Sequence, residues 1–274
     1  MINILNHSDQ IQQNLQTQGQ VCTQYVDSAG CFSCLRSNFQ TQGADTYNCL
    51  IKLALYTINY GPIYVSEIYH FLEQSQLLEN NFTGIVQSIN VMSLGCGFGP
   101  DDIALNKYRN DKQLDINFNY HGYDIEPFWN YITNTGALPI SHDILAGFDC
   151  TSVNILFINK LFSTLKNNSL DSQFLTIFQI ALQSLPVGSF VIFNDINNIN
   201  MGRDDFNTFA VSNSLQVVGK YFFNVQGTNG SPAYNSNYTA ISSTHNICQI
   251  PQNFTHTPKP QVNQTVFFLY QKVV

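Results

Sequence analysis

The sequence predicts an α/β protein: a mostly parallel, doubly wound sheet with helices on both faces, preceded by an N-terminal helical segment. Short apolar runs alternate with stretches of helical spacing from residue 88 to about 223, which is the pattern of strand–helix–strand units. A glycine-rich turn at residues 95–99 ends the first of these runs. We therefore divide the chain into an N-terminal helical segment, residues 1–84, and a main domain, residues 85–274.

The N-terminal segment has helical spacing in two places. Residues 46–58 and 64–79 carry apolar side chains at intervals of three and four, and Tyr60-Gly61-Pro62 between them predicts a turn. Residues 1–45 are polar and Gln-rich with weak periodicity, which fits either a helix or a loosely ordered arm. We expect the two helices to pack against the main domain.

The main domain reads as a series of strands and helices. Its predicted strands are 88–94, 118–123, 153–158, 189–193, 217–223 and 266–270. Its predicted helices are 101–107, 127–133, 171–185 and 206–215. Between the last two strands, residues 224–264 are rich in Asn, Ser, Thr, Gly and Pro and predict a long loop. Because no helix separates these two strands, we expect them to pair antiparallel at one edge of the sheet.

Composition limits the classes of partner and compartment. The net charge is −7, and the eleven Lys and Arg residues are scattered without a basic run, which disfavours tight binding of nucleic acid. The sequence has no apolar stretch of 18 residues, so we expect no membrane span. The first ten residues lack the basic and apolar regions of a secretion signal. We therefore expect a cytoplasmic protein.

The cysteines do not form a recognisable metal motif. There are seven, and the pair Cys31 and Cys34 forms an isolated CxxC. A structural zinc site needs four ligands at suitable spacing, and no second CxxC follows. We interpret the cysteines as reduced thiols and expect no metal.

The turn Gly95-Cys96-Gly97-Phe98-Gly99 is the first candidate for chemistry. Glycines between a strand and a helix let the backbone approach a ligand closely, and the helix N-terminus favours a carboxylate or phosphate. The pattern is GxGxG followed by Pro100, which differs from the GxGxxG of dinucleotide-binding proteins. The Gly-Lys-Ser/Thr of phosphate-binding loops is absent. These patterns predict a nucleotide-like ligand and disfavour a nicotinamide cofactor.

Further motifs follow in order along the chain. They are Gly122-Tyr123-Asp124-Ile125, His142-Asp143-Ile144, the strand 153–158 and the turn Leu185-Pro186-Val187-Gly188. Together with the run Val91 to Gly99 they resemble class I S-adenosylmethionine-dependent methyltransferases, over about residues 85–223 and more weakly the final strand. The resemblance implies a seven-stranded type of sheet, S-adenosylmethionine as cofactor and S-adenosylhomocysteine as product.

The resemblance also implies roles for individual residues. The implied cofactor contacts are Ser93, Gly95, Cys96, Gly97, Gly99, Asp101, Asp124, Ile125, Asp143 and Ile144. The glycines and Cys96 would line the methionine end, and Asp124 would accept hydrogen bonds from both ribose hydroxyls, since a carboxylate is an acceptor only. Asp143 would accept from the adenine amino group, and Ile125 and Ile144 would enclose the ring.

One position departs from the family pattern. Ser93 stands two residues before the first glycine, where the family usually carries Asp or Glu that contacts the methionine ammonium. Asp101, Asp102 or a water molecule could compensate for the missing acid.

The catalytic candidates lie at the ends of later strands. In-line methyl transfer mainly requires that the protein position and desolvate the nucleophile, and a general base is needed only when the nucleophile is protonated. The candidates are Asn159, Asn194 and Asp195, with Asp195 expected to face the ligand. Tyr60 or Tyr64 from the N-terminal segment could also reach the site.

The expected activity is methyl transfer to a small molecule or a protein side chain. The Asn/Asp-Pro-Pro-aromatic signature of amino-methylating relatives is absent, which argues against methylation of DNA bases. Two alternatives remain open. One is another use of the same cofactor, such as aminocarboxypropyl transfer or cofactor cleavage; the other is a non-catalytic cofactor-binding subunit, which Ser93 would favour.

Overall fold

The computed structural model describes residues 1–17, 49–84, 88–133, 139–223, 237–252, 254, 258–260 and 265–274. Its strands are β1 (Ser88–Leu94), β2 (Asn117–Asp124), β3 (Ile140–Ser141), β4 (Ile155–Asn159), β5 (Phe190–Ile196), β6 (Leu215–Phe223), β7 (Thr239–Ile241) and β8 (Thr265–Lys272). Its α-helices are α1 (Ile2–Thr17), α3 (Leu50–Ser75), α4 (Leu77–Asn81), α5 (Pro100–Asp111), α6 (Trp129–Thr133), α7 (Phe162–Asn167), α8 (Asp171–Ser184) and α9 (Arg203–Ser212). Short 3-10 helices span Ile144–Ala146 and Ile199–Met201.

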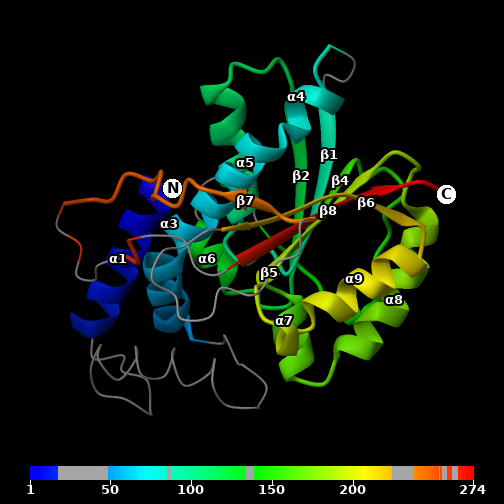
Figure 1. Cartoon of the computed structure of the whole chain (residues 1–274). Coiled ribbons are helices and arrows are strands. Elements are labelled where there is room, and N and C mark those ends of the chain that lie inside the picture. Colours follow the sequence, from blue (N-terminus) through cyan, green and yellow to red (C-terminus); the bar gives the residue numbers. More distant parts are fainter. Residues whose placement is uncertain are drawn as a thin grey trace.

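The strands form one mixed sheet in the order β3-β2-β1-β4-β5-β8-β6-β7 (Figure 1). From β3 to β5 all neighbours are parallel, and β8 runs antiparallel to both β5 and β6. The predicted α/β fold with a mostly parallel sheet is confirmed. The antiparallel pairing of the last two predicted strands is also confirmed.

The placement of that pair at one edge of the sheet was wrong. β8 lies inside the sheet, because its residues are almost all buried on both faces and an interior position covers them. The edge is occupied by the short strand β7, which pairs parallel with β6. β7 belongs to residues 224–264, which the sequence predicted to be a loop.

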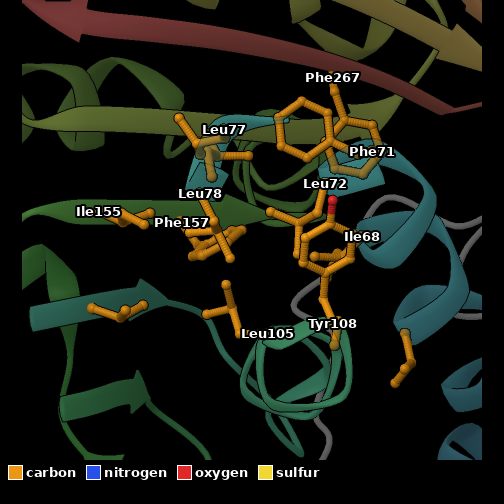
Figure 2. Close-up of a cluster of buried hydrophobic side chains, with 14 of the residues drawn as sticks. Ile68, Phe71, Leu72, Leu77, Leu78, Leu105, Tyr108, Ile155, Phe157 and Phe267 are labelled. Atoms are coloured by element: carbon orange, nitrogen blue, oxygen red, sulfur yellow. The ribbon is translucent and has the colours of Figure 1, made fainter. Parts of the chain in front are cut away.

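Helices cover both faces of the sheet (Figure 1). Side chains of α1, α3 and α5 pack on one face, with Phe71 of α3 stacked on Phe267 of β8 at 4.5 Å between ring centroids (Figure 2). Side chains of α7, α8 and α9 pack on the other face around Phe193 and Phe206. Because side chains alternate along a strand, Phe157 faces α3 and Ile158 faces α8.

Helix α3 continues without interruption through Gly61 and Pro62, so the predicted turn there was wrong. A Cβ atom at Gly61 would lie 2.5 Å from Met1 Cε and 3.3 Å from Phe98 Cζ, which shows that this glycine permits close packing. Pro62 lacks the N–H that a helix interior normally uses. Burial of α3 between α1, α5 and the sheet offsets that loss, because tertiary packing outweighs local propensity.

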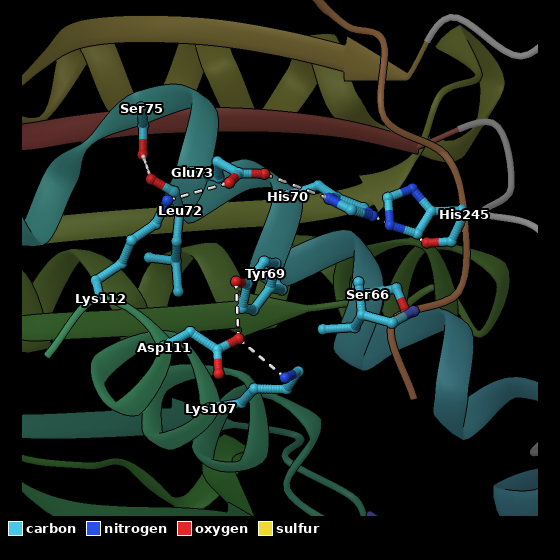
Figure 3. Close-up of polar contacts among 11 residues, drawn as sticks. Ser66, Tyr69, His70, Leu72, Glu73, Ser75, Lys107, Asp111, Lys112 and His245 are labelled. Atoms are coloured by element: carbon cyan, nitrogen blue, oxygen red, sulfur yellow. Dashed lines mark hydrogen bonds and ion pairs between the residues drawn. The ribbon is translucent and has the colours of Figure 1, made fainter. Parts of the chain in front are cut away.

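Polar contacts add to the packing of α3 on α5 (Figure 3). The Tyr69 hydroxyl donates to Asp111 Oδ2 at 2.9 Å, and Lys112 Nζ lies 3.2 Å from Glu73 Oε1. On another side of α3, the His70 ring donates from Nε2 to the carbonyl of His245 at 2.9 Å. α3 therefore joins the main domain through polar as well as apolar contacts, as expected for the helical lead-in.

For residues 1–45, the structure confirms the helical alternative over α1. The remainder of that stretch, including Cys31 and Cys34, lies outside the described residues.

Candidate functional site

The glycine-rich loop has the backbone conformation that its composition suggests. Gly95, Gly97 and Gly99 have φ angles of +64°, +55° and +76°, a region that glycine enters without steric cost. The N–H of Cys96 donates to the Tyr123 carbonyl at 3.0 Å, so the loop is tied to the end of β2. A Cβ atom on Gly122 would lie 2.7 Å from Cys96 Sγ, which explains the glycine in β2.

Asp124 is held at the carboxyl end of β2 beside this loop. Its Oδ2 accepts from the Gly97 N–H at 2.9 Å, and its Oδ1 accepts from the Glu126 N–H at 3.0 Å. Burial raises the pKa of Asp124 to about 6, although these two N–H donors oppose the shift. Each carboxylate oxygen retains acceptor capacity, so the group suits a ligand with neighbouring hydroxyls.

The predicted adenine contacts lie at the same corner of the sheet. The N–H of His142 donates to the Asp124 carbonyl at 2.9 Å, which places the residues after β3 next to the end of β2. Asp143 is exposed, and its Oδ1 accepts from the Leu145 N–H at 2.9 Å. Ile125 is 69% exposed, whereas Ile144 is only 7% exposed and packs in the core. Ile125 and Asp143 are therefore free to meet a ligand.

Ser93 and Asp101 meet in the interior beneath the loop. Both are fully buried, and Asp101 Oδ1 accepts from the Tyr120 hydroxyl at 3.0 Å. Neither Asp101 Oδ2 nor Ser93 Oγ has a hydrogen-bond partner among the described residues. Burial raises the pKa of Asp101 to about 7, while the nearby Ser93 hydroxyl, the backbone and Tyr120 oppose this shift.

The neighbouring Asp102 has a different environment from Asp101. Its Oδ1 accepts from Asn106 Nδ2 at 2.7 Å, one turn along α5. Of the two acids considered as substitutes for one at position 93, Asp101 is the one that lies beside Ser93.

Asn159 and Asn194 lie side by side at the carboxyl ends of β4 and β5. Both are buried, and both amide atoms of Asn159 and Oδ1 of Asn194 lack a partner among the described residues. Buried polar atoms are nearly always hydrogen-bonded in native proteins, so unpaired ones indicate a place for a ligand or water. The structure thus keeps Asn159 and Asn194 as candidates.

Asp195, which we expected to face the ligand, lies on the other face of β5 from Asn194, although Lys160 is close enough to oppose the burial that raises the pKa of Asp195. Because side chains alternate along a strand, Asp195 and Asn194 lie on different faces of the sheet. Asp195 pairs with Val266 of β8, whose side chain belongs to the core on the α8 side. Its Oδ2 accepts from the Ser163 N–H at 2.9 Å and its Oδ1 from the Ile196 N–H at 2.7 Å. Asp195 therefore accepts a backbone hydrogen bond from the first turn of α7.

The sequence interpretation missed a buried ion pair next to the two asparagines. Lys160 Nζ lies 3.0 Å from Glu67 Oε2 and donates to Thr265 Oγ1 at 2.7 Å. Thr265 in turn donates to Glu67 Oε1 at 2.9 Å. Two signals were available in the sequence: a lysine directly after an apolar strand, and a glutamate on the apolar side of a helix.

Aromatic rings connect the glycine-rich loop with this ion pair. Tyr60 stacks on Tyr64 with 5.8 Å between ring centroids, and Tyr56 lies 5.8 Å from Trp129. The Lys160 ammonium lies 5.5 Å from the centroid of the Tyr64 ring. Tyr64 therefore lies beside Lys160, the residue directly after β4.

Among the residues that the structure describes, no three His, Cys, Asp or Glu side chains gather as a metal site. No helix in the same part of the chain is long and apolar enough to cross a membrane.

Comparison with known proteins shows likeness at the level of fold. No protein-family model matches the sequence, and no curated protein matches it. The chain resembles a putative class I S-adenosylmethionine-dependent methyltransferase from Listeria monocytogenes, with a TM-score of 0.49 and 10% identity over 100% of this chain and 89% of that one. It also resembles the N-methyltransferase NodS from Bradyrhizobium japonicum WM9 bound to S-adenosylhomocysteine, with a TM-score of 0.48 and 11% identity over 87% of this chain and 98% of that one.

A third solved structure is the plantazolicin methyltransferase BpumL with a pentazolic desmethylPZN analog and S-adenosylhomocysteine. Its TM-score is 0.46 at 11% identity, and the match covers 100% of both chains. These identities are too low to carry residue roles or substrates from one protein to the other.

Proposed function

We propose that this chain binds S-adenosylmethionine and transfers its methyl group to a small molecule or a protein side chain, releasing S-adenosylhomocysteine. The observation that carries this proposal is the row of groups along one edge of the sheet. Asp124, the loop with Gly97, and Asn159 follow the carboxyl ends of β2, β1 and β4, which are adjacent parallel strands. Ligands of open α/β sheets bind at this edge.

The residues present fit the cofactor from its adenosine end to its amino-acid end. Asp124 offers acceptors for two hydroxyls, and Ile125 and Asp143 offer an exposed apolar surface and an exposed acceptor beside it. Gly95, Gly97 and Gly99 carry no side chains and have positive φ angles, so the loop backbone can approach a ligand closely at these positions. The unpaired oxygens of Ser93 and Asp101 lie beneath the same loop.

The acceptor is expected beyond Asn159. When bound, the cofactor supplies an electrophilic methyl group, and the chain's own contribution is to place and desolvate the nucleophile. The unpaired amide atoms of Asn159 and the unpaired Oδ1 of Asn194 can orient a group that both donates and accepts. The Lys160–Glu67 pair next to them is neutral overall and holds α3 over this end.

The net charge of −7 agrees with a small-molecule or protein acceptor better than with nucleic acid. The test has two stages. Calorimetric titration with S-adenosylmethionine and S-adenosylhomocysteine asks whether the cofactor binds; absence of binding to both would refute the proposal. Incubation with methyl-labelled cofactor, followed by separation of small-molecule and protein fractions, then shows which class of acceptor gains the label.

The products also separate the proposal from its alternatives. Methyl transfer leaves S-adenosylhomocysteine, whereas aminocarboxypropyl transfer leaves 5′-methylthioadenosine. Tight binding with neither product across a broad acceptor panel would favour a non-catalytic subunit.

A further inference from the structure

Two side chains beneath the glycine-rich loop are fully buried and incompletely hydrogen-bonded. Asp101 Oδ2 and Ser93 Oγ have no partner among the described residues, and the two side chains adjoin each other. Buried polar atoms in native proteins are nearly always hydrogen-bonded. Two such atoms lie at one place, directly under the loop expected to hold a ligand. We take this as an indication that they serve the binding of that ligand.

The surroundings of Asp101 favour its protonated form without a ligand. Tyr120 of β2 donates to it, Ser93 of β1 lies beside it, and Cys96 and Asp102 are the neighbouring titratable groups on the loop and on α5. Among the causes that shift its pKa, burial is the largest, and none is a cation of the described residues. An acid in this setting keeps its proton up to a pH of about 7, and a positive charge beside it would favour its ionised form.

The two glutamates of helix α3, which packs on α5, pair with lysines. Glu73 pairs with Lys112, just past the last residue of α5, and Tyr69 bonds Asp111 at the same end (Figure 3). Glu67 pairs with Lys160 at the end of β4. None of these three contacts provides a counter-ion for Asp101, which lies in the first turn of α5.

We propose that Asp101 is the counter-charge for the ammonium group of the cofactor's amino-acid end, and that it releases a proton when this group binds. The inference rests on the proposed function and deepens it. Because Asp101 is fully buried, it does not touch the cofactor. It acts on the ammonium group as a positioning residue, through the loop backbone and the Ser93 hydroxyl that lie between them. In this chain the negative charge for the ammonium group therefore comes from α5, the helix after the loop. Position 93, on the strand before the loop, carries an uncharged serine.

The physical consequence is a proton-linked affinity. A nearby cation favours the ionised carboxyl, so binding lowers the pKa of Asp101 from its unliganded value of about 7. Below that pH the proton must leave before the charges can pair, and the affinity falls by up to about tenfold per pH unit. Asp124 also has a raised pKa, about 6, and must be separated in any test.

The choice of ligands makes this separation. S-Adenosylhomocysteine carries the ribose, the adenine and the charged amino-acid end, whereas 5′-methylthioadenosine lacks the amino-acid end. The pH dependence of binding should reflect Asp124 for both ligands, because both carry the ribose. It should reflect Asp101 only for S-adenosylhomocysteine. We would titrate each calorimetrically from pH 5.5 to 7.5, in two buffers with different heats of ionisation, to count the protons released.

The expected result is a steeper loss of affinity for S-adenosylhomocysteine than for 5′-methylthioadenosine as the pH falls, with an additional released proton near pH 6.5. Asp101→Asn should bind S-adenosylhomocysteine about tenfold more weakly at pH 7.5 and lose this additional proton. It should bind 5′-methylthioadenosine as the unaltered protein does. Asp102→Asn, the matched control one residue along α5, should bind both ligands at pH 7.5 as the unaltered protein does; because the Asp102 charge raises the pKa of Asp101, the pH dependence for S-adenosylhomocysteine should move slightly to lower pH in this variant.

Tyr120→Phe provides a second variant in case Asp101→Asn folds poorly. Loss of the hydroxyl donor raises the pKa of Asp101 further, so the pH dependence for S-adenosylhomocysteine should move to higher pH. Equal pH dependence for both ligands in the unaltered protein, or unchanged binding in Asp101→Asn, overturns the inference and leaves the proposed function intact. Failure of the unaltered protein to bind either ligand overturns both.

Discussion

The backbone N–H of Gly97 donates a 2.9 Å hydrogen bond to Asp124 Oδ2, which joins the loop after β1 to the carboxyl end of β2. Asp124 therefore shapes the glycine-rich loop as well as offering acceptors to a ligand. A second bond from the Glu126 N–H, at 3.0 Å, fixes the other carboxyl oxygen. The ligand would find this carboxylate already oriented, which lowers the cost of binding.

Removal of the Asp124 carboxylate should weaken cofactor binding. Asp124→Ala loses two hydrogen bonds to a charged acceptor, and we expect a loss of roughly 1.5–3 kcal/mol in the binding of S-adenosylhomocysteine. Calorimetric titration at pH 7.5 measures it, and Asp115→Ala, at an exposed acid before β2, is the control. Equal affinity in the two variants would remove Asp124 from the ribose role.

Asp101→Asn should change the pH dependence of stability in the unliganded protein. Because the pKa of Asp101 rises from 3.8 to about 7 on folding, the folded state holds the proton more tightly than the unfolded state. This contribution to stability is present below pH 4 and is lost as the pH rises to about 7.

The Asn variant lacks that titration, so its stability gain over the unaltered protein should reach up to about 4 kcal/mol at pH 8 and only about 1 kcal/mol at pH 4.5. Urea unfolding at the two pH values measures the difference. Asp124, whose folded pKa is also raised, leaves a smaller slope of the same sign in the variant. A variant less stable at pH 8 would contradict the burial of an unpaired carboxyl at Asp101.

Asp195 should matter for stability rather than for the chemistry of the site. Its carboxylate accepts from the N–H groups of Ser163 and Ile196, on the face of the sheet away from Asn159. Asp195→Ala should lower the free energy of unfolding by about 1–2 kcal/mol, as loss of a helix-capping acceptor does. Asp195→Asn keeps one acceptor oxygen and should lose less.

Both Asp195 variants should bind S-adenosylhomocysteine within about twofold of the unaltered protein, because neither alters the face that carries the loop. Loss of methyl transfer in a fully stable Asp195→Asn would instead return this residue to the catalytic candidates.

The Lys160–Glu67 pair should show strong coupling between α3 and the sheet. Glu67 is fully buried and Lys160 is 14% exposed, so Lys160→Met leaves a buried carboxylate without its cation. We expect each single variant, Lys160→Met or Glu67→Gln, to lose roughly 3 kcal/mol of unfolding free energy. The double variant should lose less than the sum, and urea unfolding of all four proteins gives the coupling energy. Additive losses would mean that the two groups do not interact.

Local patterns predicted most of the individual elements. The apolar runs became β1, β4 and β5, and the acidic start at Asp101 became the first turn of α5. Tyr60-Gly61-Pro62 failed as a turn because contacts with Met1 and Phe98, distant in sequence, hold α3 in one piece. The position of β8 inside the sheet likewise depends on which faces of neighbouring strands need covering, a non-local property.

The sequence by itself determined the fold class and the cofactor candidates, because glycines at a strand–helix turn and an acid at a strand end act through local backbone geometry. Only the tertiary structure decided which acids share a site. Alternation along β5 turns Asp195 away from Asn159, while the fold of α5 against β1 brings Asp101 to Ser93. The Lys160–Glu67–Thr265 contacts join α3 to the ends of two strands, and only folding brings such distant residues together.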